Sequence, residues 1–448
     1  SMRFINNTSD LSKYLGIRIE NQALIKEIST DTRTINQGSL FIAIKGKNFN
    51  GNDYVQDAFK KGAVLALVDD LRFKDSKNKK IIYVKNTIES LTKIGKNIIN
   101  DFEGKVIAIT GSNGKTSTTS IVADSLKKVS STIENFNNEI GVPLSLINAS
   151  PKSDYLVLEI GASKFNDIDH LSKILKPDIG IITNIGNSHL EELKNTNGVL
   201  RVKSEIITHI KKNGFLVVPN DNEKHLSFWK KVRKDINIVT FGKSKSADFY
   251  SYKADLNRDG ANFYISSKNL VDSIKIKTTL EGEHNIMNIL ASCACHFCLN
   301  QDLDLFAKKI NLNKLTIKRQ RKTKWLNGST LIDDTYNANP DSTKKSIDLL
   351  CNYNNKKKIL ILGDMLELGK FRKNLHKEIG IYAKQKGIDN FLGFGNLTKV
   401  AVDAFGKNGF FFNGEKDLKA YIKDNISSKD IILIKGSRGM KMERFIDV

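Results

Sequence analysis

The stretch VIAITGSNGKTSTT, residues 106–119, decides the fold of the middle of this chain. A short apolar run ends at Thr110, a loop with two glycines follows, and a helix is expected from about Thr116 to Val129. A strand, a glycine loop and a helix in this order are typical of a phosphate-binding loop. The stretch therefore predicts a nucleotide-binding α/β domain.

The residue types in this loop explain how it would bind phosphate. Gly111 and Gly114 let backbone N–H groups approach phosphate oxygens, and the start of the helix adds partial positive charge. Lys115 can neutralise the β- and γ-phosphates, and the Thr116 hydroxyl can ligate Mg²⁺. Ile109 replaces the first glycine of the common G-x-x-x-x-G-K-[ST] pattern, so this loop is shorter. The alternative, a glycine turn with a surface lysine, leaves the lysine and threonine unexplained.

The composition is that of a globular protein with several domains. The chain has 448 residues, of which 40% are hydrophobic and 27% charged, and this excludes wholesale disorder. No apolar run approaches the roughly 20 residues that cross a bilayer, and no signal-peptide pattern is present, so we expect a cytoplasmic protein without a membrane partner. The four cysteines are too few for a disulfide scaffold, and we expect buried thiols.

The formal net charge of +22 is the extreme feature of the composition. Such a charge suits either a nucleic-acid-binding protein or an enzyme with anionic substrates. The excess is nearly all lysine and is spread over the length of the chain. Its densest run, KRQRKTK at residues 318–324, has no interleaved aromatic residues for base stacking. The charge alone does not decide between these two classes of partner; our prediction is that there is no nucleic-acid partner.

Changes in the apolar pattern divide the chain into three α/β domains in series. We predict a first domain at residues 1–102, a central P-loop ATP-binding domain with a mainly parallel sheet at 103–312, and a C-terminal Rossmann-like domain at 313–448. The first domain would include a strand in SLFIAIKG, which begins at Ser39. The third alternates strands and helices regularly, which indicates a doubly wound sheet with ligands beyond the carboxyl ends of its strands.

The central domain shows continuous apolar runs, which indicate strands that are buried on both faces of a parallel sheet. The segment from Ala247 to Lys277 alternates apolar and polar residues instead, so we expect antiparallel additions there. A helix is expected to begin near His284. The predicted parallel strands are residues 155–160, 179–185 and 215–218.

Three polar residues outside the loop bear on its function, and two of them, Glu159 and His189, could ligate a metal. Glu159 ends the strand in YLVLEIGA, and His189 follows the next strand in TNIGNSHLE, so both lie at carboxyl ends of strands. Lys203, in RVKSE, lies on a predicted helix. Each also has a plain structural interpretation: a solvated acid, a structural histidine, and a surface lysine paired with Glu205 or Glu191.

Taken together, these residues resemble the Mur ligase family, the ATP-dependent amide-forming enzymes of peptidoglycan synthesis. The motifs shared with the whole family are TGSNGKT, LEIGA, TNIGNSH, RVKSE and GEHNIMN. Four further motifs resemble the branch that adds D-alanyl-D-alanine: NFNNEIGVPL from Asn135, DDTYNANPDS from Asp333, LGDMLELG from Leu362 and KGSRGMKME from Lys435. The N-terminal ISTDTR and LFIAIKGKNFNGNDYV resemble the domain that binds the UDP-sugar substrate.

The resemblance implies a specific reaction. The enzyme would join D-alanyl-D-alanine to the C-terminal carboxylate of UDP-N-acetylmuramoyl-tripeptide through an acyl phosphate, and would release ADP and phosphate. It implies ATP and two Mg²⁺ ions as cofactors, small-molecule substrates as partners, and a monomer. It also implies that Lys203 is N-carbamylated, which turns a cation into a carboxylate-like metal ligand.

The resemblance further implies which residues carry out this reaction. The catalytic residues would be Lys115, Glu159, His189, Lys203 and Arg319. The metal ligands would be Thr116, Glu159, His189 and the carbamate of Lys203. ATP would contact Thr110, Gly111, Ser112, Asn113, Gly114, Lys115, Thr116, Ser117, Asn285, Asn288, Arg319 and Asp334, with the two asparagines near adenine, Arg319 towards the γ-phosphate and Asp334 towards the ribose. The other substrates would contact Thr30, Asp31, Arg33, Lys45, Gly46, Asn137, Asn138, Glu139, Tyr336, Asn337 and Asn339.

The chain departs from the family pattern in two places. Residues 50–52 read Asn-Gly-Asn where the family usually has Asp-Gly-His, which affects the expected pyrophosphate contacts. Lys318 stands where a glycine commonly precedes the third-domain arginine, so Arg321 could take the place of Arg319. The sequence also leaves open whether the tripeptide ends in lysine or diaminopimelate.

Three other functions remain to be weighed. A ligase of the same family could add the third amino acid of the peptide or glutamate to folate, but the YNANP and NFNNEIG segments disfavour both. A nucleic-acid-stimulated P-loop ATPase would suit the net charge of +22. A degenerate, non-catalytic protein is disfavoured because every proposed catalytic position is filled.

Overall fold

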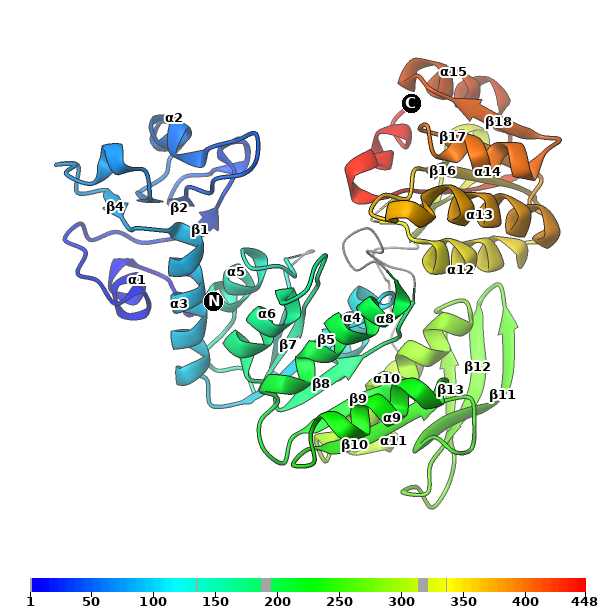
Figure 1. Ribbon diagram of the computed structural model, residues 1–448, viewed down its shortest axis with the longest axis horizontal. Coiled ribbons are helices and arrows are strands. Elements are labelled where there is room, and N and C mark those ends of the chain that lie inside the picture. The colour runs from blue at the N-terminus through cyan, green and yellow to red at the C-terminus, as the bar shows by residue number, and fades with distance from the viewer. Residues whose placement is uncertain (1, 134–135, 187–194, 313–320, 336) are drawn as a thin grey trace. The chain divides into compact units, whose positions relative to one another are not determined.

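The computed structural model describes residues 2–133, 136–186, 195–312, 321–335 and 337–448. It confirms the predicted α/β class, with helices packed on three sheets whose strands are mainly parallel (Figure 1). Internal contacts divide the chain into two compact units. The first comprises Ser1–Ala108, Leu126–Gly161 and Asp169–Asp178, and the second comprises Ile109–Ser125, Ala162–Ile168 and Ile179–Val448. The boundaries predicted after residues 102 and 312 stay predictions.

The first sheet has four parallel strands in the order β1-β2-β3-β4. The strand predicted in SLFIAIKG is β2, and all residues of β2 and β3 are buried. The strands are β1 (Glu27–Ser29), β2 (Ser39–Ile42), β3 (Leu65–Val68) and β4 (Ile81–Tyr83). The helices of this region are α1 (Thr8–Leu15), α2 (Val55–Lys60) and α3 (Thr87–Asp101).

The central sheet has nine strands in the order β13-β12-β11-β10-β9-β8-β5-β7-β6. The pairs β11–β12 and β12–β13 are antiparallel, which confirms the prediction for residues 247–277. The strands are β5 (Lys105–Thr110), β6 (Val129–Ser131), β7 (Tyr155–Glu159), β8 (Ile179–Ile182), β9 (Phe215–Pro219), β10 (Asn237–Gly242), β11 (Phe249–Asn257), β12 (Gly260–Ser266) and β13 (Ile274–Thr278). The helices are α4 (Lys115–Ser125), α5 (Gly141–Asn148), α6 (Asp167–Leu175), α8 (Thr196–Lys203), α9 (Glu223–Val232), α10 (Glu283–Cys298) and α11 (Leu303–Leu312).

Helix α10 is the most deeply buried helix near the phosphate loop, and it packs against α4 and against β9, β10 and β11. Cys293, Cys295 and Cys298 lie on this helix and are buried, as predicted. Burial raises the pKa of Cys295 to about 12, so this thiol stays protonated and unreactive. The helix thus serves as a rigid support, and its first turns face the loop.

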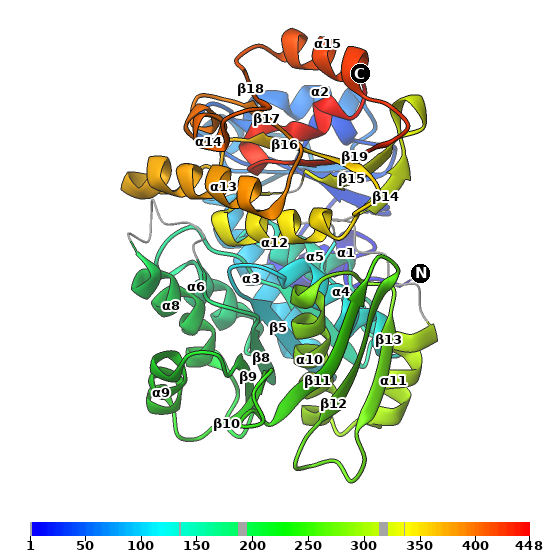
Figure 2. The same ribbon diagram turned by 90° about the vertical axis from the view of Figure 1, so that its right-hand side faces the viewer.

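The C-terminal sheet has six strands in the order β14-β15-β19-β16-β17-β18, all parallel except β14. Helices cover both faces, which confirms the Rossmann-like prediction: α15 lies on one side of the sheet and α12 and α13 on the other (Figures 1 and 2). The strands are β14 (Arg321–Lys324), β15 (Thr330–Asp334), β16 (Lys357–Gly363), β17 (Asn390–Phe394), β18 (Gly409–Phe412) and β19 (Asp430–Lys435). The helices are α12 (Pro340–Cys351), α13 (Arg372–Lys386), α14 (Thr398–Phe405) and α15 (Glu415–Asn425).

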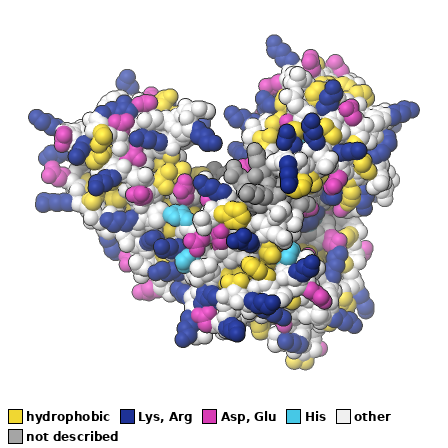
Figure 3. Space-filling view, in the orientation of Figure 1, with side chains coloured by type: hydrophobic (Ala, Val, Ile, Leu, Met, Phe, Trp, Pro, Cys, Tyr) yellow, Lys and Arg dark blue, Asp and Glu magenta, His cyan; other side chains and the backbone are white. Residues whose placement is uncertain are grey.

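The surface carries its positive charge in a dispersed form. Figure 3 shows lysine and arginine side chains scattered over the visible face, with acidic side chains between them. Within the described residues, none of the helices has both the length and the hydropathy that crossing a membrane requires.

Candidate active site

The phosphate loop lies between β5 and α4, as predicted. Gly111 has a φ of +148° and Gly114 a φ of +79°, a region of backbone conformation that favours glycine. Neighbouring side chains also exclude larger residues here: a Cβ on Gly111 would lie 1.9 Å from the Thr183 hydroxyl, and one on Gly114 would lie 2.6 Å from the Asn288 amide oxygen. Both glycines are therefore required for the loop to pass between its neighbours.

The segment that follows β8 holds the loop in place. The Asn184 side chain accepts a hydrogen bond from the backbone N–H of Asn113 (2.9 Å) and donates one to the Asn113 carbonyl (2.9 Å). The Ser112 hydroxyl accepts a hydrogen bond from the N–H of Gly186 (2.8 Å). Sequence reasoning used the TNIGNSH motif only for its histidine and missed Asn184. The same motif was the available signal, because Asn184 also lies at a strand's carboxyl end.

Lys115 and Thr116 open helix α4, and both are half-buried. The Lys115 ammonium donates a hydrogen bond to the Gly111 carbonyl (3.1 Å), so its side chain folds back across the loop. Thr110, Ser112, Asn113 and Ser117 are buried around them. This arrangement places a cation and a helix N-terminus together at one loop, which is the chemistry that binds a phosphate chain.

Glu159 ends β7 and is 1% exposed. Its Oε1 accepts a hydrogen bond from the Asn137 amide (3.0 Å), so the interpretation as a solvated acid is wrong. Asn138 is exposed and its Oδ1 accepts from the N–H of Gly141 (2.8 Å) at the start of α5, while Glu139 is exposed. In NFNNEIG, Asn137 therefore contacts Glu159, and the next two residues, Asn138 and Glu139, have exposed polar side chains.

Lys203 is the last residue of α8 and is 0% exposed, so its interpretation as a surface lysine is also wrong. Lysine is almost never fully buried without a compensating interaction, which makes this side chain a candidate for a special role. His189, expected to join it as a metal ligand, lies outside the described residues. Among the described residues, no group of three or more His, Cys, Asp and Glu side chains forms a metal-binding cluster.

Helix α10 contributes Asn285 and Asn288, which are both buried. Asn288 Nδ2 donates to Asn285 Oδ1 (3.2 Å), and Asn288 Oδ1 accepts from the Thr118 hydroxyl (3.2 Å). Asn285 Nδ2 donates to the Glu281 carbonyl (2.7 Å). Asn288 lines two cavities beside the phosphate loop, and its hydrogen bond to Asn285 fixes the orientation of its side chain.

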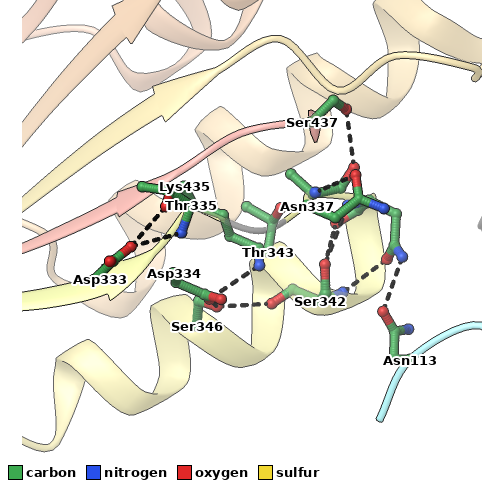
Figure 4. Close-up of polar contacts among 12 residues, drawn as sticks. Asn113, Asp333, Asp334, Thr335, Asn337, Ser342, Thr343, Ser346, Lys435 and Ser437 are labelled. Carbon is green, nitrogen blue, oxygen red and sulfur yellow. Dashed lines mark hydrogen bonds and ion pairs between the residues drawn. The ribbon is translucent and has the colours of Figure 1, made fainter. Parts of the chain in front are cut away.

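Asp334 and Lys435 form a buried ion pair at the carboxyl ends of β15 and β19 (2.9 Å), and each is 3% exposed (Figure 4). The same Asp334 oxygen, Oδ2, accepts a hydrogen bond from the Ser346 hydroxyl (2.6 Å). Both charged residues line the smaller cavity together with Asn113 and Gly114. Asp334 was predicted to contact ATP, whereas its lysine partner was not predicted.

Asn339 connects the C-terminal sheet to the phosphate loop. It caps α12 by accepting from the N–H of Ser342 (2.9 Å), and its Nδ2 donates to Asn113 Oδ1 (2.8 Å) (Figure 4). Asn337 is exposed and its side chain accepts from the N–H of Ala338 (2.9 Å). Tyr336 lies outside the described residues. Asn339 of the YNANP motif thus caps α12 and is hydrogen-bonded to the phosphate loop.

A second contact joins the segment before α10 to the C-terminal residues. The buried Glu281 carboxylate accepts hydrogen bonds from the Tyr353 hydroxyl (2.9 and 3.0 Å) and forms an ion pair with Lys322. Burial and this carboxylate raise the pKa of Tyr353 above its usual value, so the hydroxyl stays a donor. Arg319 lies outside the described residues. Arg321 begins β14 opposite Asp333, and the choice between the two arginines stays open.

The Asn339–Asn113 hydrogen bond leads to a testable prediction. Asn339→Asp keeps the cap of α12, since Asp and Asn cap helices equally well, but its carboxylate cannot donate to Asn113. We expect a melting temperature close to that of the wild type and a KM for ATP raised severalfold. Asn339→Ala should lower both stability, by about 1 kcal/mol, and ATP affinity.

A double-mutant cycle on the free energy of unfolding with Asn113→Ala provides the control. The two alanine substitutions should show a coupling energy of about 0.5–1.5 kcal/mol. Additive effects, together with an unchanged KM for ATP in Asn339→Asp, would contradict the role of this bond.

The residues predicted to bind the uridine diphosphate end lie at one edge of the first sheet. Thr30 and Asp31 follow β1, and Lys45 and Gly46 follow β2; these strands are parallel neighbours, so their carboxyl ends share an edge. Thr30 and Asp31 are half-buried, whereas Lys45 and Gly46 are exposed. The exposed Arg33 forms an ion pair with Asp31 (2.7 Å) and thereby holds the pKa of that carboxyl below its usual range.

Asn52 is one of the residues at which the Asn-Gly-Asn segment, residues 50–52, departs from the family pattern, and the structure shows what its side chain does. This side chain is 1% exposed and donates hydrogen bonds to Asn50 Oδ1 and to Asp69 Oδ1 (2.9 Å each). Its oxygen accepts from the N–H groups of Asp69 and Asp70 (3.1 Å each). Asn52 therefore fixes the loop after β3, and its polar atoms are committed within the protein.

Comparison with known protein families covers most of the chain. The Mur ligase family catalytic domain matches residues 24–98, the Mur ligase middle domain matches residues 109–296, and the Mur ligase glutamate ligase domain matches residues 319–438. The three matches follow one another in the order of the three predicted domains.

Individual proteins show the same similarity over nearly the whole length. The UDP-N-acetylmuramoyl-tripeptide–D-alanyl-D-alanine ligase of Bacillus subtilis (strain 168) is 34% identical over 436 residues, which cover 95% of this chain and 93% of that protein. The crystal structure of MurF from Acinetobacter baumannii superposes with a TM-score of 0.85 at 27% identity, over 99% of this chain and 98% of that one. MurF ligase from Thermotoga maritima in complex with ADP superposes with a TM-score of 0.77 at 28% identity, over 94% and 96% of the two chains.

Proposed function

This chain belongs to the Mur ligase family, and we propose that it joins D-alanyl-D-alanine to UDP-N-acetylmuramoyl-tripeptide with the hydrolysis of ATP to ADP and phosphate. The observation that carries the proposal is the phosphate loop, whose Asn113 is bonded to Asn339 in YNANP, a motif of the branch that uses D-alanyl-D-alanine. The ligase activity thus rests on a nucleotide site and on the residues next to it, as well as on similarity.

The reaction explains why the site needs cations. A carboxylate resists attack by an amine because oxide is a poor leaving group, so ATP first transfers its γ-phosphoryl group to the tripeptide carboxylate. The amine of D-alanyl-D-alanine then attacks the acyl phosphate carbon, phosphate leaves, and the amine loses a proton. Two anions meet in the first step, and positioned cations must offset their repulsion. Lys115 supplies one at the loop, and Arg319 or Arg321 would supply another.

Magnesium would lower the remaining charge on the phosphates when it is bound. Mg²⁺ prefers oxygen ligands, and the buried Glu159 carboxylate and the Thr116 hydroxyl are of this type. N-carbamylation would give Lys203 an oxygen donor as well and would explain why a lysine is placed where solvent has no access. We propose these three residues and His189 as the ligands of two Mg²⁺ ions.

The first sheet would hold the other end of the substrate. Thr30 and Asp31 follow β1, Lys45 and Gly46 follow β2, and Arg33 is paired with Asp31; backbone N–H groups and cations of these residues would contact a diphosphate. Because the Asn52 side chain is bonded within the protein, we assign no pyrophosphate contact to it. The monomeric state and the cytoplasmic location expected from the sequence stay predictions.

An assay of phosphate release with each substrate omitted in turn tests the proposed function. With ATP, Mg²⁺ and UDP-N-acetylmuramoyl-tripeptide present, we expect sustained release only when D-alanyl-D-alanine is added. The same assay with tripeptides that end in lysine or diaminopimelate identifies the third residue of the natural substrate.

Two results would contradict the proposal. Turnover with single amino acids and a shorter muramoyl-peptide, without a response to D-alanyl-D-alanine, would indicate a ligase for an earlier addition. ATP turnover that rises with DNA or RNA and ignores all peptides would indicate a nucleic-acid-stimulated ATPase.

A further inference from the structure

Two adjoining cavities lie beside the phosphate loop, and the inference drawn from them rests on the proposed use of ATP. The smaller cavity is lined by Asn113, Gly114 and Ser117 of the loop and the first turn of α4. The larger has a volume of about 710 Å³, within the range of small-molecule sites. Its apolar lining comprises Pro219, Phe241, Leu256, Met287 and Leu349.

This arrangement sets the direction of a bound nucleotide. The β- and γ-phosphates belong at the loop, where N–H groups and Lys115 are available. The base needs apolar surroundings, which only the larger of these two cavities provides. The α-phosphate and ribose must then pass the junction of the two cavities, which is formed by the residues that line both: Asn184, His284, Asn288 and Lys345.

Lys345 is the lysine at this junction, and the sequence analysis did not single it out. Ser342, Lys345, Ser346 and Leu349 recur at intervals of three and four residues, so they share the face of α12 that borders the cavities. The hydrogen bond from Asn339 fixes the start of this helix against the loop. Lys345 is thereby presented from the C-terminal sheet to the nucleotide side of the cavities.

The surroundings of Lys345 suit an anion. The side chain is half-buried, and burial lowers its pKa, while the negative charges of Asp341 and Asp221 act in the opposite direction. A cation that is partly removed from water gains from a ligand that brings negative charge.

We propose that Lys345 binds the α-phosphate of ATP and so ties the nucleotide to the C-terminal domain. It would act as a binding residue on the side of the nucleotide opposite the phosphate loop. The contact would help to hold α12 against the loop while the acyl phosphate is present, which limits the access of water to that intermediate.

The neighbouring Lys344 offers a matched control. It lies one position earlier on α12 and has the same charge, but it forms an ion pair with Glu378 of α13 (3.8 Å) and lies over the Tyr382 ring (5.7 Å). Removal of either lysine changes the net charge of the protein by the same amount. Of these two lysines, Lys345 lines the cavities and Lys344 does not.

The test compares nucleotide binding to the wild type, Lys345→Met, Lys345→Ala and Lys344→Met by calorimetry in the presence of Mg²⁺. Methionine keeps most of the apolar stem of lysine, so packing changes little. We expect both Lys345 variants to bind ADP and a non-hydrolysable ATP analogue about tenfold or more weakly, by similar factors. Adenosine binding should not change, and Lys344→Met should match the wild type. In the ligase assay, the KM for ATP should rise while the KM for D-alanyl-D-alanine stays constant.

Each other outcome overturns the proposal in a recognisable way. If both Lys345 variants bind ADP and the ATP analogue with wild-type affinity, Lys345 does not contact the nucleotide. A loss for the ATP analogue but not for ADP moves the contact to the γ-phosphate, and an equal loss for adenosine indicates a packing role only. If the wild type itself binds no adenine nucleotide and shows no turnover dependent on D-alanyl-D-alanine, the proposed function fails together with this inference.

Discussion

Lys203→Ala is expected to reduce the ligation rate by roughly 10³-fold or more, because it removes a ligand to the Mg²⁺ ions that neutralise the reacting phosphates. The side chain is fully buried at the end of α8, so a carbamate formed there would be shielded from solvent. Small carboxylic acids such as acetate or propionate should restore part of the rate, since they can occupy the space left by the side chain and present a carboxylate to the metal. The measurement is phosphate release at increasing acid concentration.

Lys203→Met separates this role from a purely structural one. Methionine fills most of the buried volume but cannot be carbamylated, so this variant should melt close to the wild type, remain inactive and resist rescue. The wild-type rate should not increase with the same acids. A fully active Lys203→Ala enzyme would disprove the carbamate, as would a Lys203→Met enzyme with normal turnover.

Lys115→Ala is expected to lower kcat/KM for ATP by roughly 10²–10³-fold. The lysine is the cation of the phosphate loop, and its ammonium now donates to the Gly111 carbonyl, a bond that it would exchange for phosphate oxygens. Lys115→Arg should recover only part of the activity, because the guanidinium is larger and planar and does not reproduce a compact ammonium in a short loop. Steady-state kinetics with varied ATP provide the measurement.

Lys127→Ala is the matched control for Lys115. It removes the same charge from an exposed position just beyond the end of the same helix, and its kinetics should equal those of the wild type. Binding of UDP-N-acetylmuramoyl-tripeptide should survive in Lys115→Ala, since that substrate is assigned chiefly to other residues. An unchanged KM for ATP and kcat in Lys115→Ala would refute the assignment of the loop.

Features that depend on neighbouring residues were predictable from the sequence. The two glycines and the lysine of the loop could be located because strand, loop and helix are consecutive, and the structure places them between β5 and α4. The antiparallel strands near residue 260 were predictable from alternation alone. In both cases the determining interactions lie within a few residues along the chain.

The roles of residues whose partners are distant in sequence could not be predicted from local sequence patterns. Asp334 was expected to contact the ribose, yet only the parallel pairing of β15 and β19 shows that Lys435 neutralises it within a buried pair. Asn184, in the segment after β8, fixes the phosphate loop through Asn113, which lies 71 residues away in sequence. Asn184 and Lys435 both stand in motifs at the carboxyl ends of strands, but the motifs do not show which residue each side chain contacts.

The sequence by itself determined the family, the order of the domains and the chemistry of the phosphate loop, because these reside in contiguous motifs. Only the tertiary structure decided that Lys203 is buried, that Asn339 is bonded to the loop, and that Lys345 rather than Lys344 borders the nucleotide cavities. The reason is physical: burial and the direction of a side chain depend on which segments pack against it, and those segments are distant along the chain.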